Sequence, residues 1–181
     1  MRPLPLIFLL LALGIACSDS SGPIATIENF ERTDTLWALV GTPVATPSGY
    51  SVDGSRRVRT DLSVEFDFAY NESTGDHVFL PRAALGIDTA NAAKPGFQLR
   101  NESFEAITLA PSNGYITDVA VSIAVGQRYV VRSRITCQIG VPKYAKLEIL
   151  SFDAATRVVS FRILTNDNCG FKSLEPGLPD R

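Results

Sequence analysis

Alternating apolar and polar residues predict β-strands along most of the chain, and the alternation is most regular between residues 128 and 169. Three apolar runs occur there, separated by the turn-rich segments QIGVPK and DAATR. In the first run Tyr129 and Val131 fall on one face and arginines on the other, which is the two-residue period of a half-buried strand. A cysteine lies near each end, at Cys137 and Cys169. The stretch therefore predicts a three-stranded antiparallel meander closed by a disulfide.

Further runs with the same period precede the meander. From Leu62 to Asn71 every second residue is apolar, so Leu62 and Val64 should be buried with the rest of that face. The opposite face carries Glu65 and Asp67 and should face water. Shorter strands are expected over residues 35–40, 78–81, 104–110 and 115–125.

The remaining segments separate or flank these strands. Residues 25–33 fit a short helix or a strand, because the apolar spacing is helical but the run is short. Residues 83–97 are rich in small and turn-forming residues and predict a long loop. Residues 173–181 predict an irregular surface tail. The whole is expected to be one all-β domain over residues 24–172, either an antiparallel sandwich or a partly closed barrel.

Composition excludes one class of partner. The chain has 181 residues, 45% of them hydrophobic, and a formal net charge of -2. Only 20% of the residues are charged, and they form no basic block. Because partners that carry many phosphates are held mainly by clustered cations, neither a nucleic acid nor an anionic membrane is indicated as a partner.

The N-terminal residues 1–16 predict a secretion signal, since Arg2 is followed by the apolar run LPLIFLLLALGIA. This run is shorter than the roughly 20 apolar residues that a membrane-spanning helix needs. Residues 13–17, LGIAC, resemble the lipobox of bacterial lipoproteins, in which the cysteine becomes the lipidated first residue of the mature chain. Residues 17–23 would then be the lipidated cysteine and a flexible polar tether. Ser18 after the cysteine is similar to signals that sort lipoproteins to the outer membrane.

The alternative is ordinary cleavage after Ala16, which leaves Cys17 as a plain first residue. The cysteine count bears on this choice, because three cysteines leave one unpaired in a secreted protein. A thioether on Cys17 accounts for the odd cysteine and leaves Cys137 and Cys169 to pair. That pair closes a loop of about 33 residues, which corresponds to a stabilisation of about 3 to 4 kcal/mol from chain entropy.

The residue types do not favour an enzyme or a metal site. His77 is the single histidine, no G-x-S-x-G motif is present, and a water-facing loop is expected around this histidine. One histidine and two paired cysteines are too few for a structural zinc site. Arg128, Arg132 and Arg134 share a strand face, where solvation and pairing with acids such as Glu148 are expected.

Several of these segments resemble one family. VGQRYVVRSR and PKYAKLEILSFDAATRVVSFRILTND are similar to the last strands of the HmuY-like lipoproteins. Upstream, LWALVGTPV and VEFDFAYN resemble that family's aromatic strand, glycine turn and W-D-I-A-F strand, with Phe66 in the place of the tryptophan and Asp67, Ala69 and Tyr70 in register. The resemblance covers about half of the mature chain. It implies an all-β protein anchored in the outer membrane, facing the periplasm or the outside, and in the best-known members it implies haem held by two axial side chains.

This sequence cannot supply the pair of axial ligands that the resemblance implies. A bis-histidine site needs a second histidine, and the single methionine, Met1, is in the signal. If haem binds, the ligands would be His77 with Tyr70 or another tyrosine, at the rim of a pocket walled by aromatic residues such as Phe68 and Phe79. The alternative is a pocket that holds haem without strong ligation.

Two function hypotheses follow. One is a lipoprotein that binds haem or another apolar, carboxylate-bearing molecule. The other is a structural or protein-interaction module of the envelope without a small-molecule ligand. A concave apolar cavity would favour the first hypothesis and an exposed apolar patch the second.

Overall fold

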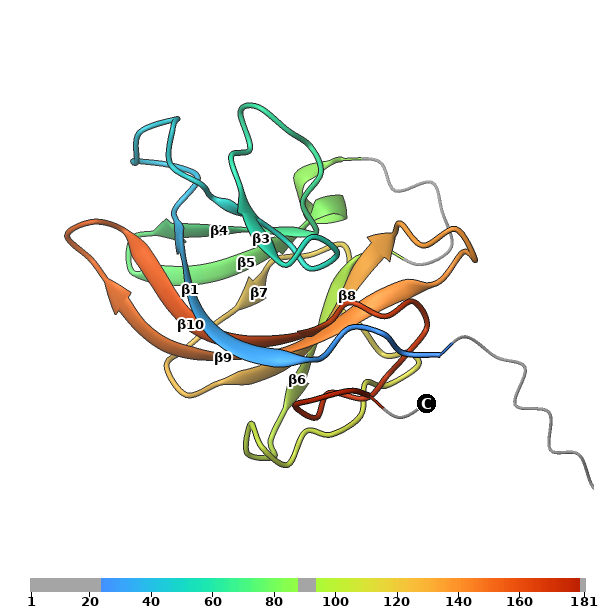
Figure 1. Cartoon of the computed structure of the whole chain (residues 1–181). Helices are drawn as coiled ribbons and strands as arrows, with labels where there is room; N and C mark the ends of the chain where they lie inside the picture. The colour runs from blue at the N-terminus through green and yellow to red at the C-terminus, as the bar shows by residue number, and fades with distance from the viewer. Residues whose placement is uncertain (1–23, 88–93, 180–181) are drawn as a thin grey trace, which may run out of the picture.

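The computed structural model describes residues 24–87 and 94–179, which form two antiparallel β-sheets packed face to face (Figure 1). The first sheet has the order β1-β10-β9-β8-β6 and the second the order β3-β2-β4-β5-β7. The strands are β1 (Phe30–Trp37), β2 (Gly49–Ser51), β3 (Arg56–Val58), β4 (Phe68–Ser73), β5 (Asp76–Pro81), β6 (Gly96–Arg100), β7 (Val121–Ser122), β8 (Arg128–Ile135), β9 (Pro142–Asp153) and β10 (Val158–Asn166), with a 3-10 helix η1 (Arg82–Leu85) after β5. The expected all-β class is confirmed, as a sandwich and not as a closed barrel.

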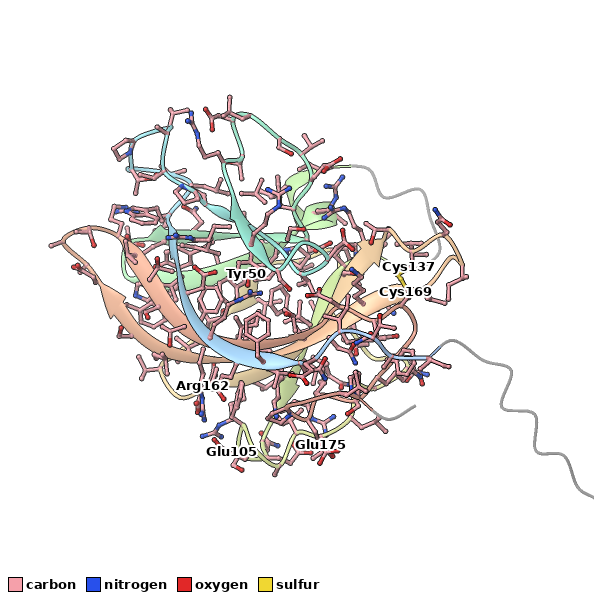
Figure 2. The ribbon with its side chains drawn as sticks, in the orientation of Figure 1. Tyr50, Glu105, Cys137, Arg162, Cys169 and Glu175 are labelled. Carbon is pink, nitrogen blue, oxygen red and sulfur yellow. A yellow bond between two sulfur atoms is a disulfide. The ribbon has the colours of Figure 1, made fainter. Side chains whose placement is uncertain are left out.

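The predicted C-terminal meander is confirmed. Strands β8, β9 and β10 are consecutive antiparallel neighbours in the first sheet. Cys137 and Cys169 are joined by a disulfide with their Cα atoms 5.9 Å apart (Figure 2). Strand β1 extends the sheet beside β10, so the segment left open between helix and strand is a strand from Phe30 onward. Strand β6 completes the sheet on the other side, next to β8.

Aromatic side chains from the two sheets fill the space between them. Phe97 of the first sheet contacts Phe68 and Phe79 of the second, with ring centroids 4.9 and 5.3 Å apart. Phe161 of the first sheet lies against Tyr50 of the second, with centroids 5.6 Å apart. All five side chains are fully buried. Because each such ring buries a large apolar area, this aromatic core dominates the attraction between the sheets.

The outer face of the first sheet is also covered, which corrects the expected solvated arginine face. Val130 and Leu164 of this face are fully buried beneath the segment between β6 and β7. Within that segment Phe104 and Ile107 pack against the sheet. The strand expected over residues 104–110 is wrong, because these residues form turns that bring side chains three positions apart onto the same face. A second, smaller core therefore lies outside the sandwich.

Two cations hold this covering segment through one aromatic ring. The Lys146 ammonium lies 4.7 Å and the Arg162 guanidinium 4.1 Å from the centre of the Phe104 ring. Lys146 also donates a hydrogen bond to the Ile107 carbonyl at 3.0 Å, and its burial lowers the pKa of the ammonium. Arg162 reaches the covering segment a second time through an ion pair with Glu105 at 3.0 Å (Figure 2). The ring thus lies between two cations, an arrangement that cation–π attraction favours.

The tail is irregular, as expected, but it does not lie loosely on the surface. Leu174 is fully buried in the outer core, and its amide donates to the Thr108 carbonyl at 2.8 Å. Asn29 and Gly177 exchange two backbone hydrogen bonds of 2.8 Å. The tail as far as Gly177 is therefore part of the folded body.

The strand expected from Leu62 to Asn71 is shorter than the alternation suggests. Strand β4 begins at Phe68, and Leu62 and Val64 are exposed instead of buried. Strand β4 starts late because its partner β2 has only three residues and pairs with β4 at Phe68 and Ala69 alone. Residues before β4 lack a partner strand within the described chain and leave the sheet.

The strand expected over residues 115–125 is similarly reduced. Strand β7 pairs with Val78 and Phe79 of β5, and Ile116 forms an isolated bridge with Phe97 of β6. Val119 and Val125, expected on a buried face, are exposed.

Asp67 is fully buried, which corrects its expected position on a solvated face. Its carboxylate accepts hydrogen bonds of 2.7 Å from the backbone amides of Val52 and Arg134. The Arg134 guanidinium lies 3.4 Å away. Burial raises the pKa of the Asp67 carboxyl, and the neighbouring cation and amides oppose that rise. Since Val52 follows the second sheet's β2 and Arg134 belongs to β8, this one carboxylate joins the two sheets.

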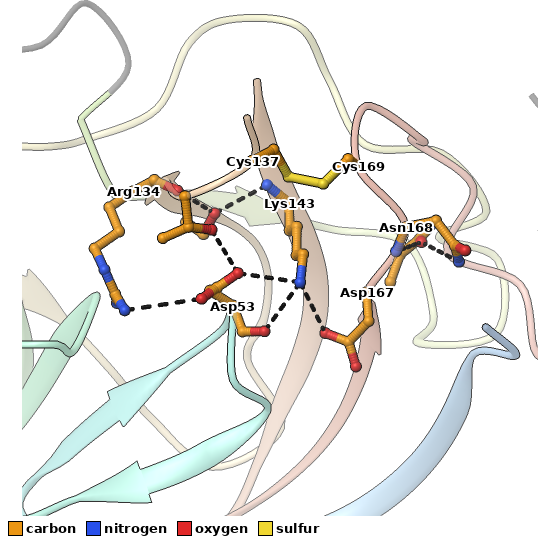
Figure 3. The surroundings of a disulfide bond; sticks show 10 residues. Asp53, Arg134, Cys137, Lys143, Asp167, Asn168 and Cys169 are labelled. Atoms are coloured by element: carbon orange, nitrogen blue, oxygen red, sulfur yellow. Dashed lines mark hydrogen bonds and ion pairs between the residues drawn. A yellow bond between two sulfur atoms is a disulfide. The ribbon is translucent and has the colours of Figure 1, made fainter. Parts of the chain in front are cut away.

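A second carboxylate continues this junction toward the disulfide (Figure 3). Asp53 lies 3.0 Å from the Lys143 ammonium and 3.9 Å from the Arg134 guanidinium. It also accepts a hydrogen bond from the Thr136 hydroxyl. Burial raises the pKa of Asp53, but the hydrogen bonds from Thr136 and Lys143 outweigh that effect and leave the pKa below its ordinary value. Thr136 precedes Cys137, so the network fixes the loop that the disulfide closes.

Replacing both Cys137 and Cys169 with alanine should lower the free energy of unfolding by about 3 to 4 kcal/mol, because the unfolded chain regains the freedom of a loop of about 33 residues. Urea denaturation of the parent and of the double variant measures this difference. Reduction of the parent with dithiothreitol is the control and should reproduce most of the loss. Equal stability of the oxidised parent and the double variant would contradict the prediction.

The variant Asp67→Asn should lose about 2 to 4 kcal/mol of stability, because one of two buried amides faces an NH₂ donor instead of an acceptor and Arg134 loses its buried partner. Glu65→Gln is the matched control. Glu65 is exposed two residues away, and its substitution should change stability by less than about 0.5 kcal/mol. A similar small effect from both substitutions in urea denaturation would show that Asp67 does not join the sheets.

Candidate functional site

Two loops project from one end of the sandwich (Figure 1), and both carry exposed aliphatic side chains. The β1–β2 loop, residues 38–48, exposes Val40 and Val44, and the β3–β4 loop, residues 59–67, exposes Leu62 and Val64. Val44 is 74% and Leu62 71% exposed. These four side chains are called the loop-end surface below. Single exposed aliphatic residues are common on proteins, but a group on neighbouring loops is typical of an interaction site.

The β1–β2 loop is held in place by hydrogen bonds within the loop and to strand β4. The Thr46 amide donates to the Pro43 carbonyl at 2.9 Å and closes the turn that carries Val44. Nearer the sheet, the Val40 amide donates to the side-chain oxygen of Asn71 in β4 at 3.1 Å. The two valines are therefore presented on a fixed backbone.

The β3–β4 loop is fixed in the same way. The Ser63 amide donates to the Arg59 carbonyl at 3.1 Å, and the Arg59 guanidinium pairs with Asp61 at 2.7 Å. Arg82, at the start of η1, donates a hydrogen bond to the Val64 carbonyl. The segments before and after Leu62 are thus tied down independently.

A third small core joins the bases of the two loops. Gly49 of β2 pairs with both Val58 and Ala69, the residues that border the β3–β4 loop. The cluster itself consists of Val58, Phe66 and Ala69, with Leu39, Leu85 and Ile87 packed against it. It takes residues from the β1–β2 loop, from the β3–β4 loop and from the segment around η1. The loops therefore form one surface and not two independent projections.

The loop-end surface is apolar at its tips and charged at its margin. Arg59, Asp61 and Glu65 lie in the β3–β4 loop among the exposed aliphatic residues, and the first two are paired. Protein–protein interfaces have this arrangement, with an apolar centre and a polar, solvent-accessible rim. The arrangement offers a hydrophobic contact with orienting charges.

Sequence pattern alone did not identify this surface. Leu62 and Val64 fit the alternation of the next strand so well that they were expected in the core. Two features of the sequence argue against a long strand that would bury Leu62 and Val64. Residues Arg59 to Asp61 form a polar turn, and the preceding residues contain no long apolar run that could pair with the segment. Val40 was predicted as the last residue of a strand, and Val44 lies beyond it among Gly, Thr and Pro residues that indicate a surface loop.

The two residues expected as haem ligands, His77 and Tyr70, do lie together. The Tyr70 hydroxyl is 2.7 Å from His77 Nδ1. His77 belongs to β5 and not to a water-facing loop, and its ring is stacked on Phe152 of β9 with centroids 3.6 Å apart and planes within 1°. This correction gives His77 a packing role, because the stack joins the second sheet to the first.

The same geometry does not fit the haem site implied by the resemblance. Axial ligands must lie on opposite faces of the macrocycle, whereas His77 and Tyr70 are hydrogen-bonded directly to each other. Phe68 and Phe79, expected to wall a pocket, are fully buried and contact each other with centroids 4.9 Å apart. These two aromatic residues therefore belong to the core between the sheets.

The other candidate residues have structural partners. Arg128 pairs with Glu148 at 2.8 Å, as expected. Arg132 donates to the Lys94 carbonyl at 2.9 Å, and Arg134 belongs to the junction between the sheets. Cys17 lies outside the described residues.

Two negative findings hold for the described part of the chain. Its His, Cys, Asp and Glu side chains form no group of three or more that could hold a metal ion. It contains no helix with the length and apolar character that crossing a bilayer requires.

Comparison with protein-family models, with curated proteins and with solved structures finds no match.

Titration of the purified domain with haemin should give no saturable shift of the Soret band, because His77 and Tyr70 bond to each other and the aromatic residues fill the interior. His77→Ala should give the same titration curve as the parent. A saturable shift in the parent that His77→Ala abolishes would show that the strand pair opens to hold haem.

Proposed function

We propose that this protein is a lipid-anchored module of the bacterial cell envelope that binds a protein partner through its loop-end surface. The observation that carries the proposal is the pair of rigid, neighbouring loops that hold Val40, Val44, Leu62 and Val64 toward solvent. Exposed aliphatic residues on ordered loops are typical of surfaces that become buried in a complex.

The filled interior supports this hypothesis over that of a small-molecule carrier. A carrier of apolar ligands needs a concave space lined by apolar side chains. Here the inner faces of the two sheets meet through Phe68, Phe79 and Phe97, all fully buried. Opening a cavity of ligand size would break these aromatic contacts, whereas the loop-end surface is already exposed.

The anchor part of the proposal rests on the N-terminal sequence. The signal over residues 1–16, the lipobox ending at Cys17 and the following Ser18 support lipidation and sorting to the outer membrane. The disulfide between Cys137 and Cys169 supports an oxidising compartment. The resemblance to HmuY-like lipoproteins supports an anchored β domain, and we extend it to fold and anchor only.

The loop geometry also bears on affinity. Fully burying one valine or leucine side chain contributes about 1.5 to 3 kcal/mol. Ordering a flexible loop on binding costs part of this gain, and the hydrogen bonds that already fix both loops reduce that cost. Val44 and Leu62, at the tips, should therefore contribute most.

The test is site-specific photo-crosslinking in the cells that make the protein. A benzophenone side chain placed at Val44 or at Leu62 should crosslink the chain to one discrete protein upon irradiation. Adding Val64→Asp to the Val44 probe should abolish that product by placing a charge in the apolar contact, with little change in the stability of the exposed loop.

Val125 is the matched control position, because it is as exposed as Val64, at 60%, but lies outside the loop-end surface. A benzophenone there should give no discrete product. The same product from Val125, or none from either loop position, would overturn the proposal.

A further inference from the structure

Three chain segments without any charged residue meet at the end of the molecule where the described chain begins. They are residues 24–27, residues 136–141 between β8 and β9, and residues 168–171 after β10. They are called the uncharged end below. Charged residues border these segments along the chain, with Glu28 after the first and Asp167 and Lys172 on either side of the third.

Named contacts hold the three segments together. The Asn168 side chain accepts hydrogen bonds from the amides of Thr26 and Ile27 at 2.9 and 3.0 Å and donates to the Ile27 carbonyl at 2.7 Å. The disulfide joins Cys137 of the second segment to Cys169 of the third. Thr26 and Ile27 are thus fixed beside the disulfide loop.

The uncharged end exposes three isoleucines. Ile24 is 81%, Ile139 62% and Ile27 45% exposed. Ile139 adjoins the third segment, since a Cβ placed on Gly170 would lie 4.0 Å from the Ile139 Cδ1 atom. The apolar side chains therefore come from at least two of the three segments and share one end of the fold.

The short tether limits what can lie opposite this end. Six residues separate Cys17 from Ile24. Even a fully extended chain of that length spans only about 25 Å, at about 3.3 to 3.6 Å per residue. If Cys17 is lipidated, as in the proposed function, Ile24 cannot move farther than this from the lipid head groups.

We propose that the uncharged end rests on the lipid bilayer, with Ile24, Ile27 and Ile139 in contact with the head-group region. Apolar side chains without neighbouring charges suit a bilayer surface, because contact with the head-group region strengthens with the apolar area that is buried. Protein interfaces, in contrast, have polar rims. The loop-end surface, which has such a rim, differs from the uncharged end in this respect. The acyl chains provide the anchoring, and the isoleucines orient the domain.

The test compares amide hydrogen exchange in two forms of the full mature chain. One is the lipidated protein in vesicles of phosphatidylethanolamine and phosphatidylglycerol, and the other is the Cys17→Ser protein in solution. Exchange in residues 138–140 should be about tenfold slower in the vesicle-bound form, because contact with lipid restricts opening and solvent access. Exchange in residues 42–46 and 60–65 should be the same in both forms.

A variant with Ile24→Ser and Ile139→Ser should stay on the vesicles through its acyl chains but lose the slower exchange at residues 138–140. The matched variant with Val44→Ser and Leu62→Ser should keep it. Slower exchange in the loop-end segments instead, or equal exchange throughout, would overturn the inference.

The mass of the mature N-terminal peptide separates this inference from the proposed anchor. An unmodified Cys17 would refute lipidation. The orientation would then be tested with a hexahistidine tag at the mature N-terminus, bound to nickel-chelating lipid in the same vesicles. Slower exchange at residues 138–140 in that form would support the inference, and its absence would overturn it.

Discussion

The contact between aromatic rings of opposite sheets is the interaction on which the rest of this structure depends. Each sheet alone would expose a wide apolar face, and the sheets become stable only when those faces meet. Phe97 contacts both Phe68 and Phe79, and Tyr50 lies against Phe161. Opening a cavity among these side chains would cost a large part of the stability of the fold. A filled centre bears on the proposed function, because the proposed partner would then contact the outside of the sandwich.

Much of the outside is also covered. The segment after β6 and the tail bury the outer face of the first sheet, with Phe104 between Lys146 and Arg162. Ion pairs of Arg162 with Glu148 and Glu105 add to this cover. Most of the large apolar side chains that stay exposed lie in loops, and the proposed contacts use those at the ends of the sandwich.

The sequence predicted the parts of the fold in which local pattern and pairing agree. Strands β8 to β10 are long and adjacent in the chain, so alternation, turn residues and the cysteines all indicate the same meander. The prediction failed where alternation continued beyond the available partner strand, as at Leu62 and Val64, because pairing with β2 is a long-range property that one segment does not encode. It failed again at Asp67, since a carboxylate is buried only when donors from distant segments converge on it. The candidate surface was missed for the first of these reasons.

Charge distinguishes the two apolar ends that result. At the loop end, Arg59 and Asp61 pair beside Leu62, so a partner must match both an apolar tip and fixed charges, which is a requirement for specificity. At the uncharged end, the disulfide and the Asn168 hydrogen bonds replace ion pairs in holding the loops. The ion pairs of Asp53 with Lys143 and Arg134 lie just inside this end, where Lys143 is largely buried. Such an end can meet an apolar or weakly polar surface without desolvating an unpaired charge, and it is also the end at which the described chain begins.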